Sequence, residues 1–244
     1  MTIIYAIIKR ELLSYFSTPV AYVFLVIFVV MNSLCTFYLG DILQRGQADL
    51  VPFFEFHPWL YMLLVPALSM RLWSEERKSG TIEVLLTLPI TTLQAVLGKF
   101  LAAWCFSGLA LLATFPIPAT VNYLGNPDNL IILVGYFGSF LMAGGFLAIG
   151  SCVSSVTQNQ VIAFILSFII CFLFNMSGFP IVLDFFSTWA PQTVLEAVSS
   201  FSFITHFKSI SKGVLDLRDL IFFGSLTISF IFINCVLVEL KRNK

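Results

Sequence analysis

Long uncharged hydrophobic stretches alternate with short segments that carry nearly all of the charges. The uncharged stretches are Leu12–Gly40, Phe56–Met70, Phe100–Pro127, Asn129–Leu183 and Leu220–Val238. About 20 apolar residues in a helix cross the ~30 Å hydrocarbon layer of a bilayer. Asn129–Leu183 is too long for one helix, and it divides at the polar run Ser154–Gln160. The pattern predicts an all-α polytopic membrane protein with six transmembrane helices. The second of these needs Val51–Phe54 or Leu72–Trp73 to reach across.

The first 18 residues have a different pattern, in which apolar side chains recur at helical spacing beside charged ones. The apolar positions are Ile3, Ile4, Ile7, Ile8, Leu12 and Tyr15, with Lys9, Arg10 and Glu11 among them. This spacing predicts an amphipathic helix that lies along the membrane interface. Pro19 then ends this helix or starts the first span. Two roles stay open, a plain interfacial anchor or a helix that moves with a partner.

The segment from Glu75 to Ile90 is the only long charge-dense part of the chain. Gly80 predicts a turn, after which Thr81 can cap a short helix that ends at Pro89. The apolar members Ile82, Leu85, Leu86 and Pro89 share one face of it. Thr91 and Gln94 then form a predicted capping box at the start of the third span. Such a short helix needs a partner groove or the membrane to be stable. It either docks on a soluble partner or is an interfacial loop that only dips its Leu residues into lipid.

Composition supports the membrane prediction. The chain is 59% hydrophobic, only 11% charged, and its mean hydropathy is +0.96, whereas soluble domains carry about 25% charged residues. Its net charge of zero provides no electrostatic surface for nucleic acid. All five cysteines lie in apolar runs without a CxxC pair, which favours packing roles over metal or redox chemistry.

The distribution of Lys and Arg predicts the orientation. With six spans, nine of these residues lie on the side of the termini and four on the other. The positive-inside rule then makes both termini cytoplasmic. Residues Arg71, Glu75, Glu76 and Arg77 are predicted to form an ion-pair cluster at the cytoplasmic surface. The Ser154–Gln160 turn is also predicted to be cytoplasmic, and Asp184–Asp219 external.

The sequence carries no signature of catalysis, a bound cofactor or a metal. There is no G-x-x-x-x-G-K-[ST] phosphate loop, and His57 and His206 stand far apart without other ligands at metal spacing. We therefore expect no enzyme activity in this chain. Asn32, Asn175 and Asn234 are predicted to form interhelix hydrogen bonds. A close-packing face is predicted on the fourth span from its small residues Gly135, Ser139, Ala143, Gly144 and Ala148. A kink is predicted in the outer part of the third span from Pro116 and Pro118.

Several motifs resemble the permease subunits of type-2 ABC transporters. They are Lys9–Arg10–Glu11, Pro66–Leu72, Glu75–Glu76–Arg77, Ser79–Pro89, Leu97–Gly98–Lys99, Ile149–Gly150 with Ser154–Gln160, and His206–Asp219. The resemblance covers essentially the whole chain, and its most specific part is the Glu–Arg…Gly–Thr–Ile–Glu…Leu–Leu…Pro block. It is strongest to the branch that includes gliding-motility permeases and the permease for nitrous-oxide-reductase maturation.

This resemblance implies a six-helix permease in a bacterial inner membrane that pairs with a second copy or a homologous permease. ATP and Mg would bind a separate P-loop ATPase. Segment 1–18 would be a connecting helix, 71–95 a cytoplasmic coupling loop and 184–219 a re-entrant or external region. The implied ATPase-docking residues are Gly80, Thr81, Ile82, Glu83, Leu85, Leu86 and Pro89 in the first coupling helix, and Thr157 and Gln158 in a second contact.

Three functions stay open at this point. The expected one is an ATP-driven exporter that moves an amphipathic molecule, whose identity the sequence does not provide. The second is a mechanical relay that passes ATP-driven work to a periplasmic accessory protein without moving a solute. The third is a membrane scaffold unrelated to ABC transporters, whose central loop only contacts lipid.

Overall fold

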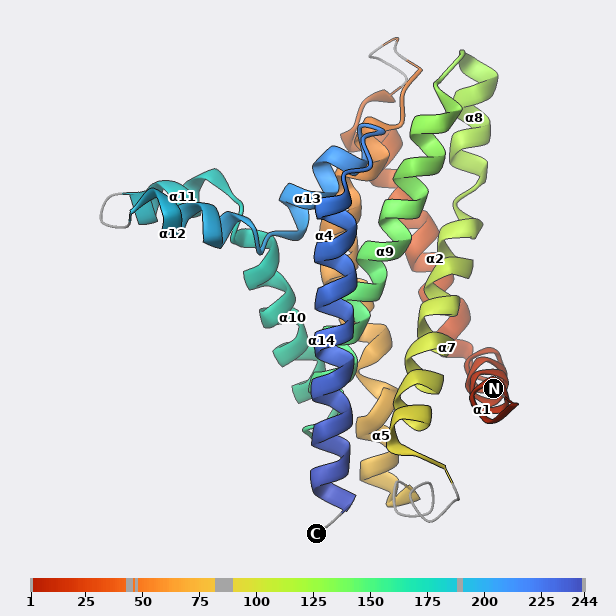
Figure 1. Cartoon of the computed structure of the whole chain (residues 1–244). Helices are drawn as coiled ribbons and strands as arrows, with labels where there is room; N and C mark the ends of the chain where they lie inside the picture. The colour runs from red at the N-terminus through yellow and green to blue at the C-terminus, as the bar shows by residue number, and fades with distance from the viewer. Residues whose placement is uncertain (1, 43–45, 47, 82–89, 188–190, 243–244) are drawn as a thin grey trace.

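The computed structural model of the chain describes residues 2–42, 46, 48–81, 90–187 and 191–242. Every regular element in these ranges is helical, as expected (Figure 1). The elements are α1 (Thr2–Ser17), α2 (Pro19–Leu34), the π-helical η1 (Cys35–Leu39), α4 (Val51–Ser69), α5 (Arg71–Ser79), α7 (Thr92–Ala113), α8 (Pro116–Leu124), α9 (Asn129–Ser154), α10 (Gln160–Met176), α11 (Pro180–Ser187), α12 (Gln192–Ser199), α13 (Phe203–Ile210) and α14 (Leu217–Arg242).

Five helical runs in the described part of the chain are long and apolar enough to cross a membrane. They are Ala21–Leu39, Val51–Ser79, Thr92–Leu124, Asn129–Ser154 and Leu217–Leu240. The chain is thus a multi-pass membrane protein. The predicted fifth span, α10, has 17 residues, about 25 Å at 1.5 Å per residue, so six full spans stay a prediction. In Figure 1, α10 and α13 nevertheless carry the chain from the lower end of α9 to the upper end of α14.

Helix α9 lies at the centre of the bundle and contacts α4, α7, α10, α13 and α14. Its small residues make this possible, as predicted. A Cβ atom at Gly135 would lie 2.5 Å from the Phe54 ring, and one at Gly144 would lie 3.0 Å from the Trp104 ring. Trp104 in turn donates its indole N–H to the Phe140 carbonyl at 2.8 Å. Close packing of α9 against α4 and α7 therefore requires glycine at these positions.

The predicted helix boundaries are confirmed where residues are described. Pro19 occupies the first turn of α2, and α7 begins with the capping box of Thr91 and Gln94, whose two hydrogen bonds measure 3.2 and 3.0 Å. The third span breaks before Pro116, between α7 and α8. Gly80 ends α5 with φ of 72°. These boundaries depend on local chemistry, which explains why the pattern predicts them.

The three asparagines behave differently from one another. Asn175 donates to the Pro58 carbonyl at 3.0 Å and Asn234 to the Ser151 hydroxyl at 2.8 Å, so both join separate helices as predicted. The prediction is wrong for Asn32. Its amide donates to the Phe28 carbonyl at 2.8 Å, one turn earlier in its own helix, because a short polar side chain can bond to the backbone carbonyl four residues before it.

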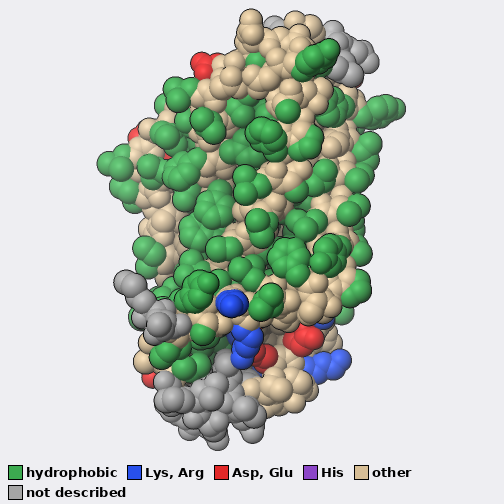
Figure 2. Space-filling view, turned by 90° about the vertical axis from the view of Figure 1, so that its right-hand side faces the viewer, with side chains coloured by type: hydrophobic (Ala, Val, Ile, Leu, Met, Phe, Trp, Pro, Cys, Tyr) green, Lys and Arg blue, Asp and Glu red, His purple; other side chains and the backbone are tan. Residues whose placement is uncertain are grey.

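The surface is organised along the long axis of the bundle. Figure 2 shows hydrophobic side chains over most of the height of one face, with the visible Lys and Arg side chains gathered near one end, beside several acidic ones. Helix α1 lies across the bundle near that end, whereas α11 and α12 extend away from the bundle in the other half (Figure 1). The charged end is where the predicted cytoplasmic segments meet.

Candidate functional site

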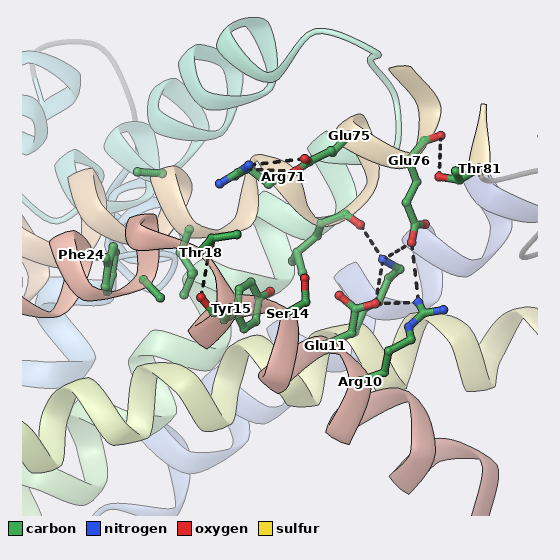
Figure 3. A pocket seen from close by; sticks show the side chains of 15 residues that line it. Arg10, Glu11, Ser14, Tyr15, Thr18, Phe24, Arg71, Glu75, Glu76 and Thr81 are labelled. Carbon is green, nitrogen blue, oxygen red and sulfur yellow. Dashed lines mark hydrogen bonds and ion pairs between the residues drawn. The ribbon is translucent and has the colours of Figure 1, made fainter. Parts of the chain in front are cut away.

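Lys99 connects three helices at the charged end of the bundle. Its side chain is buried in the second turn of α7, and its ammonium lies 2.8 Å from Glu76 of α5 and 3.5 Å from Glu11 of α1. The same ammonium donates to the Leu72 carbonyl at 2.9 Å. Arg10 pairs with Glu11 at 2.7 Å and lies 3.8 Å from Glu76. We name Arg10, Glu11, Glu76 and Lys99 the charged junction (Figure 3).

Local sequence explains why Lys99 can be held here. The preceding Gly98 has no side chain, and a Cβ there would lie 2.6 Å from Ile7, so α1 packs directly on α7. On the other side the Trp73 ring centroid lies 5.2 Å from the Lys99 ammonium, a distance typical of a cation–π contact. Lys99 is thereby enclosed by helices that also supply its acids.

Burial makes these ion pairs stronger than pairs at the surface. The exposed fraction is 3% for the Lys99 side chain, 15% for Glu11 and 19% for Glu76, and charges interact more strongly where water is excluded. Burial alone raises the pKa of Glu11, but Lys99 and Arg10 outweigh this effect and lower it below its usual value. Glu11 is therefore held as a carboxylate.

The structure corrects the predicted ion-pair cluster of Arg71, Glu75, Glu76 and Arg77. Arg71 pairs with Glu75 at 3.0 Å, one helical turn away, but Glu76 turns to Lys99 instead. Arg77 has no acid within ion-pair distance among the described residues, and its guanidinium donates to the Val156 carbonyl at 3.4 Å. Consecutive positions on a helix face different directions, so the four residues divide into three separate contacts.

Ser154 joins the end of α9 to the start of α5. Its hydroxyl donates to the Met70 carbonyl at 2.9 Å and accepts from the backbone N–H groups of Trp73 at 3.1 Å and Ser74 at 3.2 Å. The residue thus satisfies backbone groups at the junction of α4 and α5, where N–H groups need a partner. Ser154 and Arg77 together hold the α9–α10 turn against α5.

The described docking residues lie at two places, the end of α5 and the α9–α10 turn that contacts α5. Gly80 and Thr81 are exposed at the end of α5, where the Thr81 hydroxyl meets that of Ser79 at 2.9 Å. Ile82, Glu83, Leu85, Leu86 and Pro89 lie outside the described residues. In the α9–α10 turn, Gln158 is exposed and Thr157 is half-buried, accepting from the Asn159 N–H at 3.1 Å. The two predicted contacts are therefore attached to the same helix.

Four residues of the site were not predicted from the sequence: Arg10, Glu11, Lys99 and Ser154. A signal existed for Lys99, because its charge lies just before an apolar span. The polar run Ser154–Gln160 marked a turn, but it gave no signal for the partners of Ser154, which lie 80, 81 and 84 positions earlier in the chain.

The two histidines have separate surroundings. His57 is buried in α4, 2.7 Å from the Ser139 hydroxyl. His206 lies 2.6 Å from the Asp219 carboxylate and 2.9 Å from the Ser200 carbonyl, and so joins α13 to α14. Among the residues that the structure describes, no group of three or more His, Cys, Asp or Glu could hold a metal ion.

A family model described as ABC-2 family transporter protein matches residues 5–239. No curated protein matches the chain. Because the match extends over nearly the whole length, the chain belongs to the ABC-2 transporter family.

Proposed function

We propose that this ABC-2 family permease is the membrane-spanning subunit of an ATP-driven exporter, with a separate P-loop ATPase as its partner. Members of the family work with an ATPase and form dimers. The sequence contains no P-loop of its own. Family membership also removes the interpretation as a scaffold unrelated to ABC transporters.

One observation supports this proposal most directly. Helix α5, which ends at the predicted docking segment Gly80–Pro89, is hydrogen-bonded to α9 through Ser154 and ion-paired to α1 and α7 through Lys99. It also follows α4 with only Met70 between them. A displacement of the docking segment would therefore move several spans together. The ATPase would close on ATP, press on this segment and shift the permease dimer between inward-facing and outward-facing states.

The substrate class that we propose is an amphipathic molecule. The chain contains 27 Phe, and its predicted spans contain no deeply placed charge that would suggest ion coupling. The proposed location is a bacterial inner membrane with both termini in the cytoplasm. The finer likeness to gliding-motility and nitrous-oxide-reductase-maturation permeases belongs to this proposal as well.

Two lysine substitutions test the docking assignment, one that reverses a charge and one that places a charge on the apolar face. Glu83→Lys and Leu85→Lys, each on the proposed ATPase-facing helix, should uncouple ATP hydrolysis from transport while the protein still inserts in the membrane. Glu196→Lys, on the exposed helix α12, is the matched control and should leave coupling unchanged. The readout is the ATPase rate of the co-purified complex in liposomes, with transport measured in parallel. Unchanged coupling in both docking variants would refute the assignment.

A mechanical relay is the second candidate, and one observation favours it. Helix α12 has no buried residue, and Val194 and Phe201 are exposed by 41% and 58%. Together with α11 it extends away from the bundle (Figure 1), a suitable position for an accessory protein on the outer side. Stimulation of the ATPase by lipids in liposomes would support export. Stimulation only by an added periplasmic partner would support the relay.

A further inference from the structure

A cavity of about 490 Å³ lies beside the charged junction, between α1 and α2 on one side and α4, α5 and α7 on the other. It has one polar and one apolar end. Figure 3 shows Glu11, Glu76 and Thr81 toward one end and Phe24 toward the other. Ala21, Ala67 and Leu68 complete the apolar wall. An amphipathic molecule fits this division, with its head at the charged junction.

Two buried polar atoms in the cavity wall lack a hydrogen-bond partner among the described residues. They are the hydroxyl of Tyr15 and the Oε2 atom of Glu76, whose Oε1 atom binds Lys99. A buried polar atom without a partner is costly. A carboxylate oxygen only accepts hydrogen bonds, so Oε2 of Glu76 is suited to an N–H or O–H donor of a bound molecule.

The charges around the cavity narrow the class of that molecule. Three cations, Arg10, Arg71 and Lys99, line it together with three acids, Glu11, Glu75 and Glu76. Because these charges balance, an anionic head would meet no excess of positive charge. Arg71 binds Glu75 through Nε and one terminal nitrogen, which leaves its other terminal nitrogen to donate to a phosphate oxygen.

We infer that this cavity binds the head of a zwitterionic phospholipid that carries a primary ammonium, as in phosphatidylethanolamine. The ammonium donates to Glu76 and the Tyr15 hydroxyl, the phosphate accepts from Arg71, and the acyl chains leave past Phe24 into the bilayer. Leu13, Tyr22 and Val23, each next in the sequence to a residue that lines the cavity, are exposed apolar side chains that suit contact with lipid. This inference is independent of the proposed ATPase and export.

Lipid retention by the full-length protein tests the inference. The protein is purified in mild detergent with equal amounts of phosphatidylethanolamine, phosphatidylcholine and phosphatidylglycerol, and the retained lipid is measured by native mass spectrometry. Phosphatidylcholine has the same net charge but no N–H donor. We expect about tenfold preference for phosphatidylethanolamine, since a hydrogen bond to a charged group contributes about that factor.

Tyr15→Phe is the decisive variant, because it removes a hydroxyl that bonds to no described residue and should leave folding intact. It should reduce the preference severalfold, and Glu76→Gln should abolish it. Tyr123→Phe, at a tyrosine that is 90% exposed, is the matched control and should retain the full preference. Equal retention of phosphatidylethanolamine and phosphatidylcholine, stronger retention of phosphatidylglycerol, or an unchanged preference in both cavity variants would overturn the inference.

Discussion

The Lys99 ammonium and the Glu76 carboxylate meet at 2.8 Å in a place from which water is largely excluded. Lys99 belongs to a membrane-crossing helix, and Glu76 to the helix that leads to the predicted docking segment. A charge in such surroundings is stable only with its partners in place. The pair therefore makes the position of α5 relative to α7 energetically specific.

Removing the Lys99 charge should destabilise the protein. Lys99→Met leaves Glu11 and Glu76 without their shared partner, and breaking a buried pair in this way costs about 3 kcal/mol. Thermal unfolding in detergent measures the effect as a lower Tm. Lys212→Met, at an exposed lysine, is the control and should leave Tm unchanged. Equal Tm values for the two variants would contradict a stabilising role for the junction.

Ser154→Ala should loosen α5 from α9. The substitution deletes the hydroxyl that serves two backbone N–H groups and one carbonyl, at a cost of about 2 kcal/mol for the buried groups left unpaired. Hydrogen exchange of the Trp73 and Ser74 amides should rise in this variant. Ser229→Ala is the control, at an exposed serine bonded only within its own helix, and it should change neither amide exchange nor Tm. Unaltered exchange of the two amides in Ser154→Ala would refute the contact.

Substitution of Gly80 should strain the end of α5. Its φ of 72° lies in the left-handed region, where a residue with a Cβ costs about 1 kcal/mol. A Cβ there meets no atom of the described residues within 4 Å, so Gly80→Ala chiefly tests the backbone. Gly224→Ala also meets open space but lies within α14, where alanine should stabilise the helix by about 1 kcal/mol. A destabilising effect only at position 80 is expected, and Tm shifts of the same sign would contradict it.

Acidification should weaken the charged junction through Glu11. Its pKa is lowered in the folded protein, so its contribution to stability is complete above its usual pKa of 4.5 and disappears as the pH falls through the folded value. Tm measured between pH 7 and pH 3 should therefore decline less steeply for Glu11→Gln than for the unchanged protein. Glu196→Gln should keep the original slope. Parallel curves for all three proteins would show that Glu11 contributes nothing.

Local chemistry allowed the helix boundaries to be predicted. Pro19, Gly80, Pro116 and the capping box at Thr91 each act through their own backbone or within one turn of the helix. The lengths of the uncharged runs predicted six spans, and five of them correspond to helices long enough to cross a membrane. This works because the hydrophobicity of a span is a sum over consecutive residues. The docking prediction over Ile82–Pro89 remains a prediction, because those residues lie outside the described ones.

The polar partners of residues in distant segments are determined only by the tertiary structure. Whether Glu76 pairs with an arginine of its own helix or with Lys99 depends on how α5 is rotated against α7. The charge pattern along one helix does not contain that angle. Asn32 and Asn175 show the same limit, since identical side chains in apolar spans bond within a helix in one case and between helices in the other. Apolar patterning therefore decides where the helices lie along this chain, while the mutual rotation of the packed helices decides which polar groups meet.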